Sequence, residues 1–167
     1  MSRRRGIAPR RAAGIRSMAV AKRRYEAKGN HRPFSVKRTR IGLGLFTREP
    51  ISCGALVVEY TGALLPSEEA YRRGGRYLFE VNSRWIIDGA GRENISRYIN
   101  HSCRPNCEPR TRGMRVLIYA RRNIRAGEEL SYDYGKEYFD DLIKPKGCKC
   151  DYCAGRKGGR RKPGKER

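Results

Sequence analysis

The sequence predicts a single, mostly β domain of many short strands between residues 33 and 153. Short segments rich in β-branched and aromatic residues follow one another there, and turn residues separate them. Few stretches favour helix, and no internal repeat is visible. The 167 residues suffice for one such domain with a tail on either side.

Each expected element follows from its local pattern. Apolar and polar residues alternate at 34–38, a glycine-containing turn leads into a strand at 41–46, and Asn82-Ser83 can join two strands as a hairpin. Proline and acids in the first turn favour a short helix at 66–71, and Asn94 can cap one or two helical turns at 94–100. The expected strands lie at residues 34–38, 41–46, 55–60, 77–81, 85–88, 115–120 and 130–134.

The net charge of +22 is concentrated in the two tails. Residues 1–32 contain 11 Lys and Arg against one acid, and residues 154–167 contain seven against one. The stretch between them is nearly balanced, with 21 basic and 15 acidic residues. Such tails suit a polyanion such as nucleic acid or a nucleosome. A tail that only aids solubility, or an organelle transit peptide at the N-terminus, has the same composition.

The sequence argues against a membrane-spanning or secreted protein. No apolar run reaches the roughly 18 residues that a membrane helix needs, and no apolar segment follows the N-terminal arginines as in a signal peptide. We therefore expect no membrane partner.

Three of the six cysteines, Cys148, Cys150 and Cys153, fall within six residues, which is typical of thiolate metal ligands. They indicate a reducing intracellular compartment: the nucleus or chromosome in a eukaryote, or the cytoplasm or a targeted host cell for a bacterial protein.

Three further segments have patterns that functional sites use. Gly42-Leu43-Gly44 lets the backbone turn tightly and approach a ligand, although such a glycine pair is usually only a turn. The run Asn100-His101-Ser102-Cys103 is dense in hydrogen-bonding groups, yet a histidine near a cysteine is more often structural than catalytic. Tyr132 and Tyr134 would share one strand face, where core packing is the common reason.

Taken in order, these segments resemble the motifs of the SET-domain family of lysine methyltransferases. Residues 42–46 resemble the first motif, 77–79 the substrate-channel strand, 99–103 the asparagine-histidine motif and 129–134 the C-terminal tyrosine motif. The cysteines at 148–153 resemble the post-SET cysteines, and an N-terminal cysteine cluster of the pre-SET kind is missing, so a second zinc cluster is not expected. Glu93 stands where the family often has glycine, and two residues separate the last two cysteines where longer gaps are common. The resemblance covers residues 34–153, and four motifs in the right order make it specific.

The resemblance implies a SET-domain fold of small sheets, in which the asparagine-histidine segment and the last tyrosine strand meet in a knot-like crossing. It implies an enzyme in which a neutral lysine amine attacks the methyl group of S-adenosylmethionine in line. Cofactor and substrate would enter a narrow channel from opposite faces. The implied boundaries are 33–140 for the SET domain and 141–155 for a post-SET zinc segment, with basic tails at 1–32 and 156–167.

The resemblance also implies roles for individual residues. Tyr134 would be the catalytic tyrosine, and Tyr77 and Tyr132 would line the lysine channel. The cofactor would be held through the backbone of Gly42, Leu43 and Gly44 and by Arg97, Asn100 and His101. One structural zinc would be bound by Cys103, Cys148, Cys150 and Cys153.

Two other cysteines have different expectations. Cys107 is the alternative fourth zinc ligand in place of Cys103. Cys53 lies in a connection between strands and is expected to be a small buried apolar side chain.

The residue two before Tyr134 bears on the product. In the family this position lines the space that a methylated amine must occupy, and the hydroxyl of Tyr132 can hydrogen-bond the amine or hold a water against it. We therefore expect mainly monomethyl-lysine on an exposed lysine of a basic protein, such as a histone or ribosomal protein. The alternative for Tyr132 is plain packing with its hydroxyl in solvent, and Tyr77 could also set the channel width.

Two rival functions remain at this stage. An inactive SET fold could bind nucleic acid or chromatin, but the retention of Asn100, His101 and Tyr134 favours an active enzyme. A zinc-ribbon binding module would need two paired cysteine knuckles, and the sequence has one compact cluster.

Overall fold

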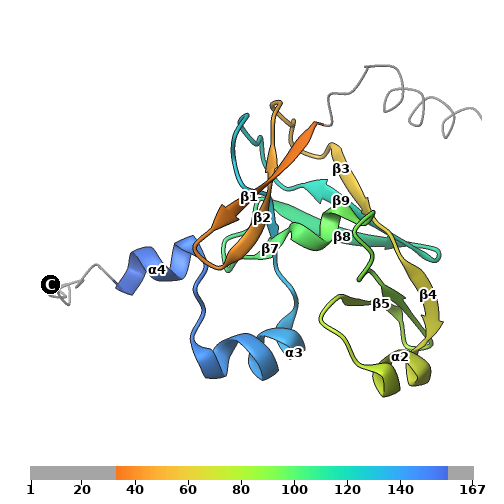
Figure 1. Ribbon diagram of the computed structural model, residues 1–167. Helices are drawn as coiled ribbons and strands as arrows, with labels where there is room; N and C mark the ends of the chain where they lie inside the picture. Colours follow the sequence, from red (N-terminus) through yellow and green to blue (C-terminus); the bar gives the residue numbers. More distant parts are fainter. Residues whose placement is uncertain (1–32, 158–167) are drawn as a thin grey trace, which may run out of the picture. The chain divides into compact units, whose positions relative to one another are not determined.

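The computed structural model describes residues 33–157, which form short strands and a few short helical segments (Figure 1). The predicted tail at 1–32 and all but the first residues of the tail at 156–167 lie outside the described residues. Within the described part, no helix is long and apolar enough to cross a membrane. The prediction of a mostly β fold of small sheets is confirmed.

Three of the sheets are antiparallel. β1 (Phe34–Thr39) and β2 (Gly42–Thr47) form a hairpin. The two three-stranded sheets have the orders β3-β9-β8 and β4-β6-β5. Their strands are β3 (Leu56–Tyr60), β9 (Arg115–Ala120), β8 (Cys107–Arg112), β4 (Ala63–Pro66), β6 (Trp85–Asp88) and β5 (Leu78–Asn82).

A short parallel pair joins two segments that are far apart in the sequence. β7 (Asn100–His101) pairs with β10 (Ser131–Tyr132), so that His101 lies opposite Tyr132. Parallel strands need a crossover, and here the chain runs through β8 and β9 between them. The predicted meeting of the asparagine-histidine segment with the tyrosine segment is thereby confirmed.

Buried apolar residues hold this pair in place. Ile99 directly precedes β7 and Leu130 directly precedes β10, and they are 1% and 0% exposed. Both belong to the same core cluster as Leu45 of β2 and Ile118 of β9. Burying each such side chain contributes roughly 2 kcal/mol, which fixes the polar residues next to Ile99 and Leu130 in space.

Within residues 33–157, the helical segments are all short. α2 (Ser67–Arg73) has Glu68 and Glu69 in its first turn and two arginines in its last, which suits the helix dipole. The others are the 3₁₀ turns η1 (Ile95–Tyr98) and η3 (Lys144–Lys146), the π-helical turn η2 (Phe139–Ile143), α3 (Lys136–Tyr138) and α4 (Asp151–Lys157).

Four details differ from the sequence-based expectations. β8 and β4 were not expected, and the strand expected at 130–134 is only Ser131–Tyr132. Proline is rare in strands, so Pro109 argued against a strand at this position. β8 tolerates it because this strand lies at the edge of its sheet. The strand at 130–134 stops early because the Tyr134 N–H donates to the imidazole of His101 rather than to a neighbouring strand. The helix α4 runs to Lys157, two residues past the expected end of the post-SET segment at 155.

Asn94 does precede η1, but its side chain makes no capping hydrogen bond. It is buried and instead donates to the Gly89 carbonyl at 3.0 Å and accepts from the Thr61 N–H at 3.3 Å. A Cβ at position 89 would lie 2.3 Å from the Asn94 Nδ2, so this glycine makes room for the amide. Asn94 therefore ties two loops together rather than starting a helix.

Candidate active site

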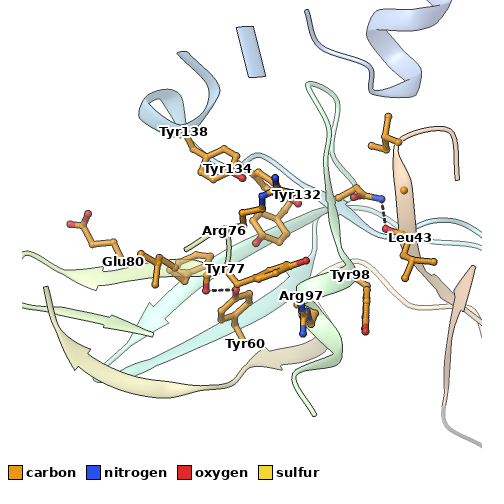
Figure 2. Close-up of a pocket in the computed structure, with 15 residues that line it drawn as sticks. Leu43, Tyr60, Arg76, Tyr77, Glu80, Arg97, Tyr98, Tyr132, Tyr134 and Tyr138 are labelled. Carbon is orange, nitrogen blue, oxygen red and sulfur yellow. Dashed lines mark hydrogen bonds between the residues drawn. The ribbon is translucent and has the colours of Figure 1, made fainter. Parts of the chain in front are cut away.

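A cavity of about 620 Å³ lies beside the β7–β10 pair, and Figure 2 shows tyrosine side chains gathered around it. Seven of the predicted site residues line it: Gly42, Leu43, Tyr77, Arg97, Asn100, Tyr132 and Tyr134. Gly44 and His101 do not. Phe79, from the segment that resembles the substrate-channel strand, also lines it. Further lining residues that sequence reasoning missed are Tyr60, Arg76, Glu80, Tyr98 and Tyr138.

The predicted channel and catalytic tyrosines lie side by side. The rings of Tyr132 and Tyr134 are 5.0 Å apart between centroids. The Tyr134 hydroxyl donates to the Ile99 carbonyl at 2.8 Å. The Tyr132 side chain is 7% exposed, and its hydroxyl has no hydrogen-bond partner within residues 33–157. Burial raises the pKa of both phenols, which therefore keep their protons at neutral pH.

Tyr60 supports the opposite wall of the cavity. Its hydroxyl donates to the Tyr77 carbonyl at 2.8 Å, as the dashed line in Figure 2 marks. Its ring lies 5.2 Å from that of Phe79, and burial, followed by the nearby Asp88 carboxylate, raises the pKa of the phenol. The sequence signal was weak, because a tyrosine at the end of the β-rich run 55–60 is typical of ordinary core packing.

Arg97 has a polar atom without a partner beside this cavity. Its guanidinium stacks over the Tyr77 ring at 4.0 Å, and it donates to the Ala90 carbonyl. Its Nε is buried and has no hydrogen-bond partner among the described residues. A buried donor without an acceptor is costly, so this atom is suited to an acceptor on a bound molecule.

Asn100 joins three of the sequence motifs. Its Nδ2 donates to the Leu43 carbonyl at 3.1 Å and to Oε1 of Glu129 at 2.8 Å. A Cβ at Gly44 would lie 2.4 Å from that same carboxylate oxygen. The missing side chain at Gly44 thus makes room for Glu129, and its predicted contact with a cofactor stays a prediction.

Asn106 also organises the crossing, and sequence reasoning missed it. Its side chain donates to the Glu129 carbonyl at 2.8 Å and accepts from the Ser131 N–H at 2.9 Å. It is 3% exposed. Its position shortly after the asparagine-histidine run, next to Pro105, was the available signal.

His101 lies outside the large cavity but lines two smaller ones of about 420 and 250 Å³. It is buried, and burial lowers the pKa of its imidazole against the opposing effect of the Asp133 carboxylate. The 250 Å³ cavity is lined by Tyr134 and by the cysteine segment 147–150 as well as by His101. The structure thus brings the predicted zinc segment up to the predicted cofactor residues.

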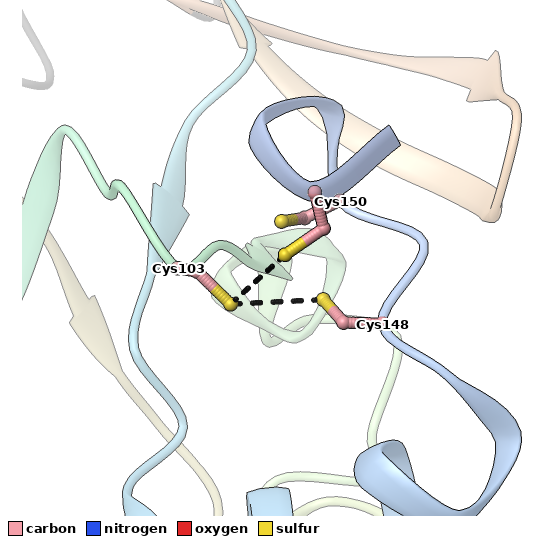
Figure 3. Close-up of side chains that lie close together, drawn as sticks. Cys103, Cys148 and Cys150 are labelled. Atoms are coloured by element: carbon pink, nitrogen blue, oxygen red, sulfur yellow. Dashed lines mark hydrogen bonds between the residues drawn. The ribbon is translucent and has the colours of Figure 1, made fainter. Parts of the chain in front are cut away.

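Four cysteines converge as the sequence suggested. The Sγ atoms of Cys103, Cys148, Cys150 and Cys153 all lie within 4.8 Å of one another. Figure 3 shows Cys103, which follows β7, close to Cys148 and Cys150 of the C-terminal segment. Cys103 Sγ is 3.7 Å from that of Cys148 and 3.5 Å from that of Cys153. Thiolates at about 2.3 Å from a tetrahedral zinc are about 3.8 Å apart, so these residues fit a zinc ion.

The other two cysteines lie elsewhere. Cys107 is fully buried in the core, where burial raises the pKa of its thiol to about 12, and it is not part of the cluster. The expectation that Cys53 is buried is wrong. It is exposed in the connection before β3, where its Sγ lies 3.3 Å from the Arg121 carbonyl, because this connection runs over the surface.

Arg40, in the turn between β1 and β2, contacts the cysteine segment. Arg40 donates to the Lys149 carbonyl at 3.1 Å and to Asp151 at 2.7 Å. Both partners of the ion pair are largely exposed, so it contributes only about 0–1 kcal/mol. The stronger restraint on this segment must come from its cysteines.

Comparison with known proteins agrees with this architecture. The family model described as "SET domain" matches residues 42–135. The chain is 40% identical over 120 residues to "Histone-lysine N-methyltransferase set-2" of Caenorhabditis elegans. The aligned region covers 64% of this chain and 8% of that protein. It is 34% identical over 158 residues to "Histone-lysine N-methyltransferase trithorax" of Drosophila virilis, covering 86% of this chain and 4% of that protein.

A third relative is "Histone-lysine N-methyltransferase 2D" of Homo sapiens, which is 37% identical over 120 residues, or 64% of this chain and 2% of that protein. The chain therefore spans less than a tenth of the length of these relatives. The family match covers more than half of the chain and includes the parallel β7–β10 pair. With its four-cysteine cluster in the place of a post-SET segment, this chain belongs to the SET-domain family.

Proposed function

We propose that this protein is an S-adenosylmethionine-dependent protein-lysine N-methyltransferase. The observation that carries the proposal is the tyrosine-lined cavity at the β7–β10 pair, where Tyr77, Tyr132 and Tyr134 meet Asn100 and Gly42. The names of the three relatives, each a histone-lysine N-methyltransferase, support it.

The cofactor, when bound, supplies an electrophilic methyl group on a sulfonium. The residues that would hold it are the backbone of Gly42 and Leu43, Asn100, and Arg97, whose buried Nε has no acceptor among the described residues. The 250 Å³ cavity beside His101 and the cysteine segment would take the adenine. The role of Gly44 would be to leave room for Glu129, which fixes the Asn100 amide.

The tyrosines would prepare the lysine. Aromatic walls exclude water from the amine, and desolvation favours its neutral, nucleophilic form. The protonated phenols of Tyr132 and Tyr134 can orient the amine without competing for its proton. The Tyr134 hydroxyl is itself held by the Ile99 carbonyl, so its lone pairs are directed before the substrate arrives.

A basic protein substrate is supported by charge around an adjoining cavity of about 630 Å³. This cavity shares Glu80 and Tyr134 with the first one and also contacts Glu137 and Asp141. Glu80, Glu137 and Asp141 have no ion-pair partner within residues 33–157, although the protein as a whole carries a charge of +22. We propose that they attract Lys and Arg residues flanking the target lysine, as found in histone or ribosomal protein tails.

Labelled S-adenosylmethionine incubated with the protein and a cell lysate tests the function directly. Labelled lysines within basic segments are the expected outcome, and mass spectrometry would identify them. A folded, zinc-replete protein that labels no lysine in any fraction would refute the proposal.

We further propose that the product is mainly monomethyl-lysine. Tyr132 lines the cavity and its hydroxyl has no hydrogen-bond partner in the described residues, which supports a role in binding the amine or a water against it. A second methyl group would displace that hydrogen bond. A penalty of about 1.4 kcal/mol slows the second transfer roughly tenfold.

The Tyr132→Phe variant checks this proposal. We expect its product to shift toward di- and trimethyl-lysine, measured by mass spectrometry on a peptide. Stability should change little, because the lost hydroxyl has no partner among the described residues. Tyr119→Phe, which removes a hydroxyl on β9 outside the cavity, is the matched control and should still yield the monomethyl product. Efficient trimethylation by the wild type would contradict the argument.

We propose domain boundaries of 33–140 for the SET domain and 141–155 for the post-SET segment. We also propose that the basic tails contact nucleic acid or a nucleosome.

A deletion of the N-terminal tail tests the second proposal. Deleting residues 1–32 removes 11 Lys and Arg. We expect a higher KM on nucleosomes, a flatter salt dependence and an unchanged rate on a short peptide. Equal loss on both substrates would mean that the segment supports the fold instead.

The compartment we propose is a reducing one, because the cysteine cluster must stay free of disulfides to hold zinc. The names of the relatives refer to histones, which favours the nucleus or chromosome among the alternatives.

A further inference from the structure

Both ring nitrogens of His101 face partners within the protein. Nδ1 lies 3.3 Å from the backbone nitrogen of Tyr134, which donates to it. Nε2 lies 3.4 Å from the Sγ of Cys103. The ring is 7% exposed and is held between Tyr134, at 5.5 Å between centroids, and Phe139, at 5.3 Å.

These contacts determine where the proton of the neutral ring resides. The Asp133 carboxylate oxygen lies 3.6 Å from Nδ1, beyond hydrogen-bond distance, whereas the Tyr134 N–H is within it. A backbone N–H can only donate, so Nδ1 is the acceptor and carries no proton. The proton is therefore on Nε2, which faces the Cys103 sulfur. A metal-bound thiolate is a hydrogen-bond acceptor, and such contacts from outside the ligand set orient the ligand and raise metal affinity.

We infer that His101 is a positioning residue that couples the four-cysteine metal site to the backbone of Tyr134. One hydrogen bond holds a predicted zinc ligand, and the other holds the residue predicted to be catalytic. Loss of zinc then loosens Tyr134 through one intervening side chain. Both ring nitrogens are then engaged within the protein, and the predicted contact of His101 with the cofactor stays a prediction.

This inference rests on the proposed function only for the catalytic role of Tyr134. Its structural part concerns zinc affinity and the Tyr134 amide, which can be measured without any methyl transfer. A protein that proves inactive could therefore still show the coupling, and an active one could lack it.

The test uses two substitutions that each keep one of the two hydrogen bonds. His101→Asn keeps an acceptor near the Nδ1 position but has no donor that reaches Cys103. His101→Gln places a donor near the Nε2 position but no acceptor for the Tyr134 N–H. The full-length, zinc-loaded proteins are titrated with a zinc chelator, and hydrogen exchange of the Tyr134 amide is followed by NMR.

We expect His101→Asn to lower zinc affinity about 10- to 100-fold while the Tyr134 amide stays protected. His101→Gln should keep zinc affinity within about threefold of wild type but lose protection at that amide. Phe139→Leu, which changes packing against the ring but neither hydrogen bond, is the matched control and should retain both properties.

A measurement on the wild type needs no substitution. Removing zinc should speed exchange at the Tyr134 amide more than at Ile118, which is buried in β9. Unchanged protection of Tyr134 after zinc removal would overturn the inference, and so would wild-type zinc affinity in His101→Asn.

Discussion

Tyr134→Phe is expected to reduce kcat for methyl transfer by about 100- to 1000-fold, which is the usual cost of losing one preorganised polar group in an active site. Tyr134 is a half-buried residue of the cavity wall, and its hydroxyl is oriented by the Ile99 carbonyl at 2.8 Å. Phe removes this group and almost no volume. The rate is measured with labelled cofactor on a peptide at saturating substrate.

The stability cost of Tyr134→Phe should be about 1 kcal/mol, the net value of one hydrogen bond. Tyr119→Phe is the matched control, because it deletes the same atom on β9, where the ring packs under Arg110 outside the cavity. That variant should keep full activity. Wild-type activity in folded Tyr134→Phe would remove the catalytic role and leave an ordinary core tyrosine.

Zinc removal is expected to have the largest effect on structure. Freshly purified, reduced protein should contain one zinc per chain by metal analysis. Structural zinc contributes on the order of 10 kcal/mol in small metal-dependent segments. Little else anchors residues 148–157: Cys150 is buried, but the ion pair of Arg40 with Asp151 is exposed. Chelation should therefore release this segment and open the 250 Å³ cavity.

Paired substitutions separate ligand loss from general damage. Cys103→Ser should abolish stoichiometric zinc and make residues 148–157 sensitive to protease, with loss of cofactor binding. Cys53→Ser, at an exposed cysteine outside the cluster, should retain zinc and activity. Metal-free protein with an unchanged protease pattern would contradict the metal site.

The amino-acid sequence alone determined the fold class, most strand positions and the order of the motifs. Alternation and turn residues are local properties, so the hairpin around Asn82-Ser83 and the strand at 115–120 could be predicted from them. The compact cysteine run at 148–153 likewise predicted a metal site, because its three thiols are close in any conformation.

Only the tertiary structure decided which distant residues meet. Whether Cys103 or Cys107 joins the cluster depends on where the chain turns after β7, and the structure places Cys107 in the core. The close fit of Gly44 to Glu129 joins residues far apart in sequence. The exposure of Cys53 and the edge position of Pro109 depend on what packs beside them. Local patterns report how a residue suits its own strand or turn, whereas these contacts arise from packing between elements that no local pattern contains.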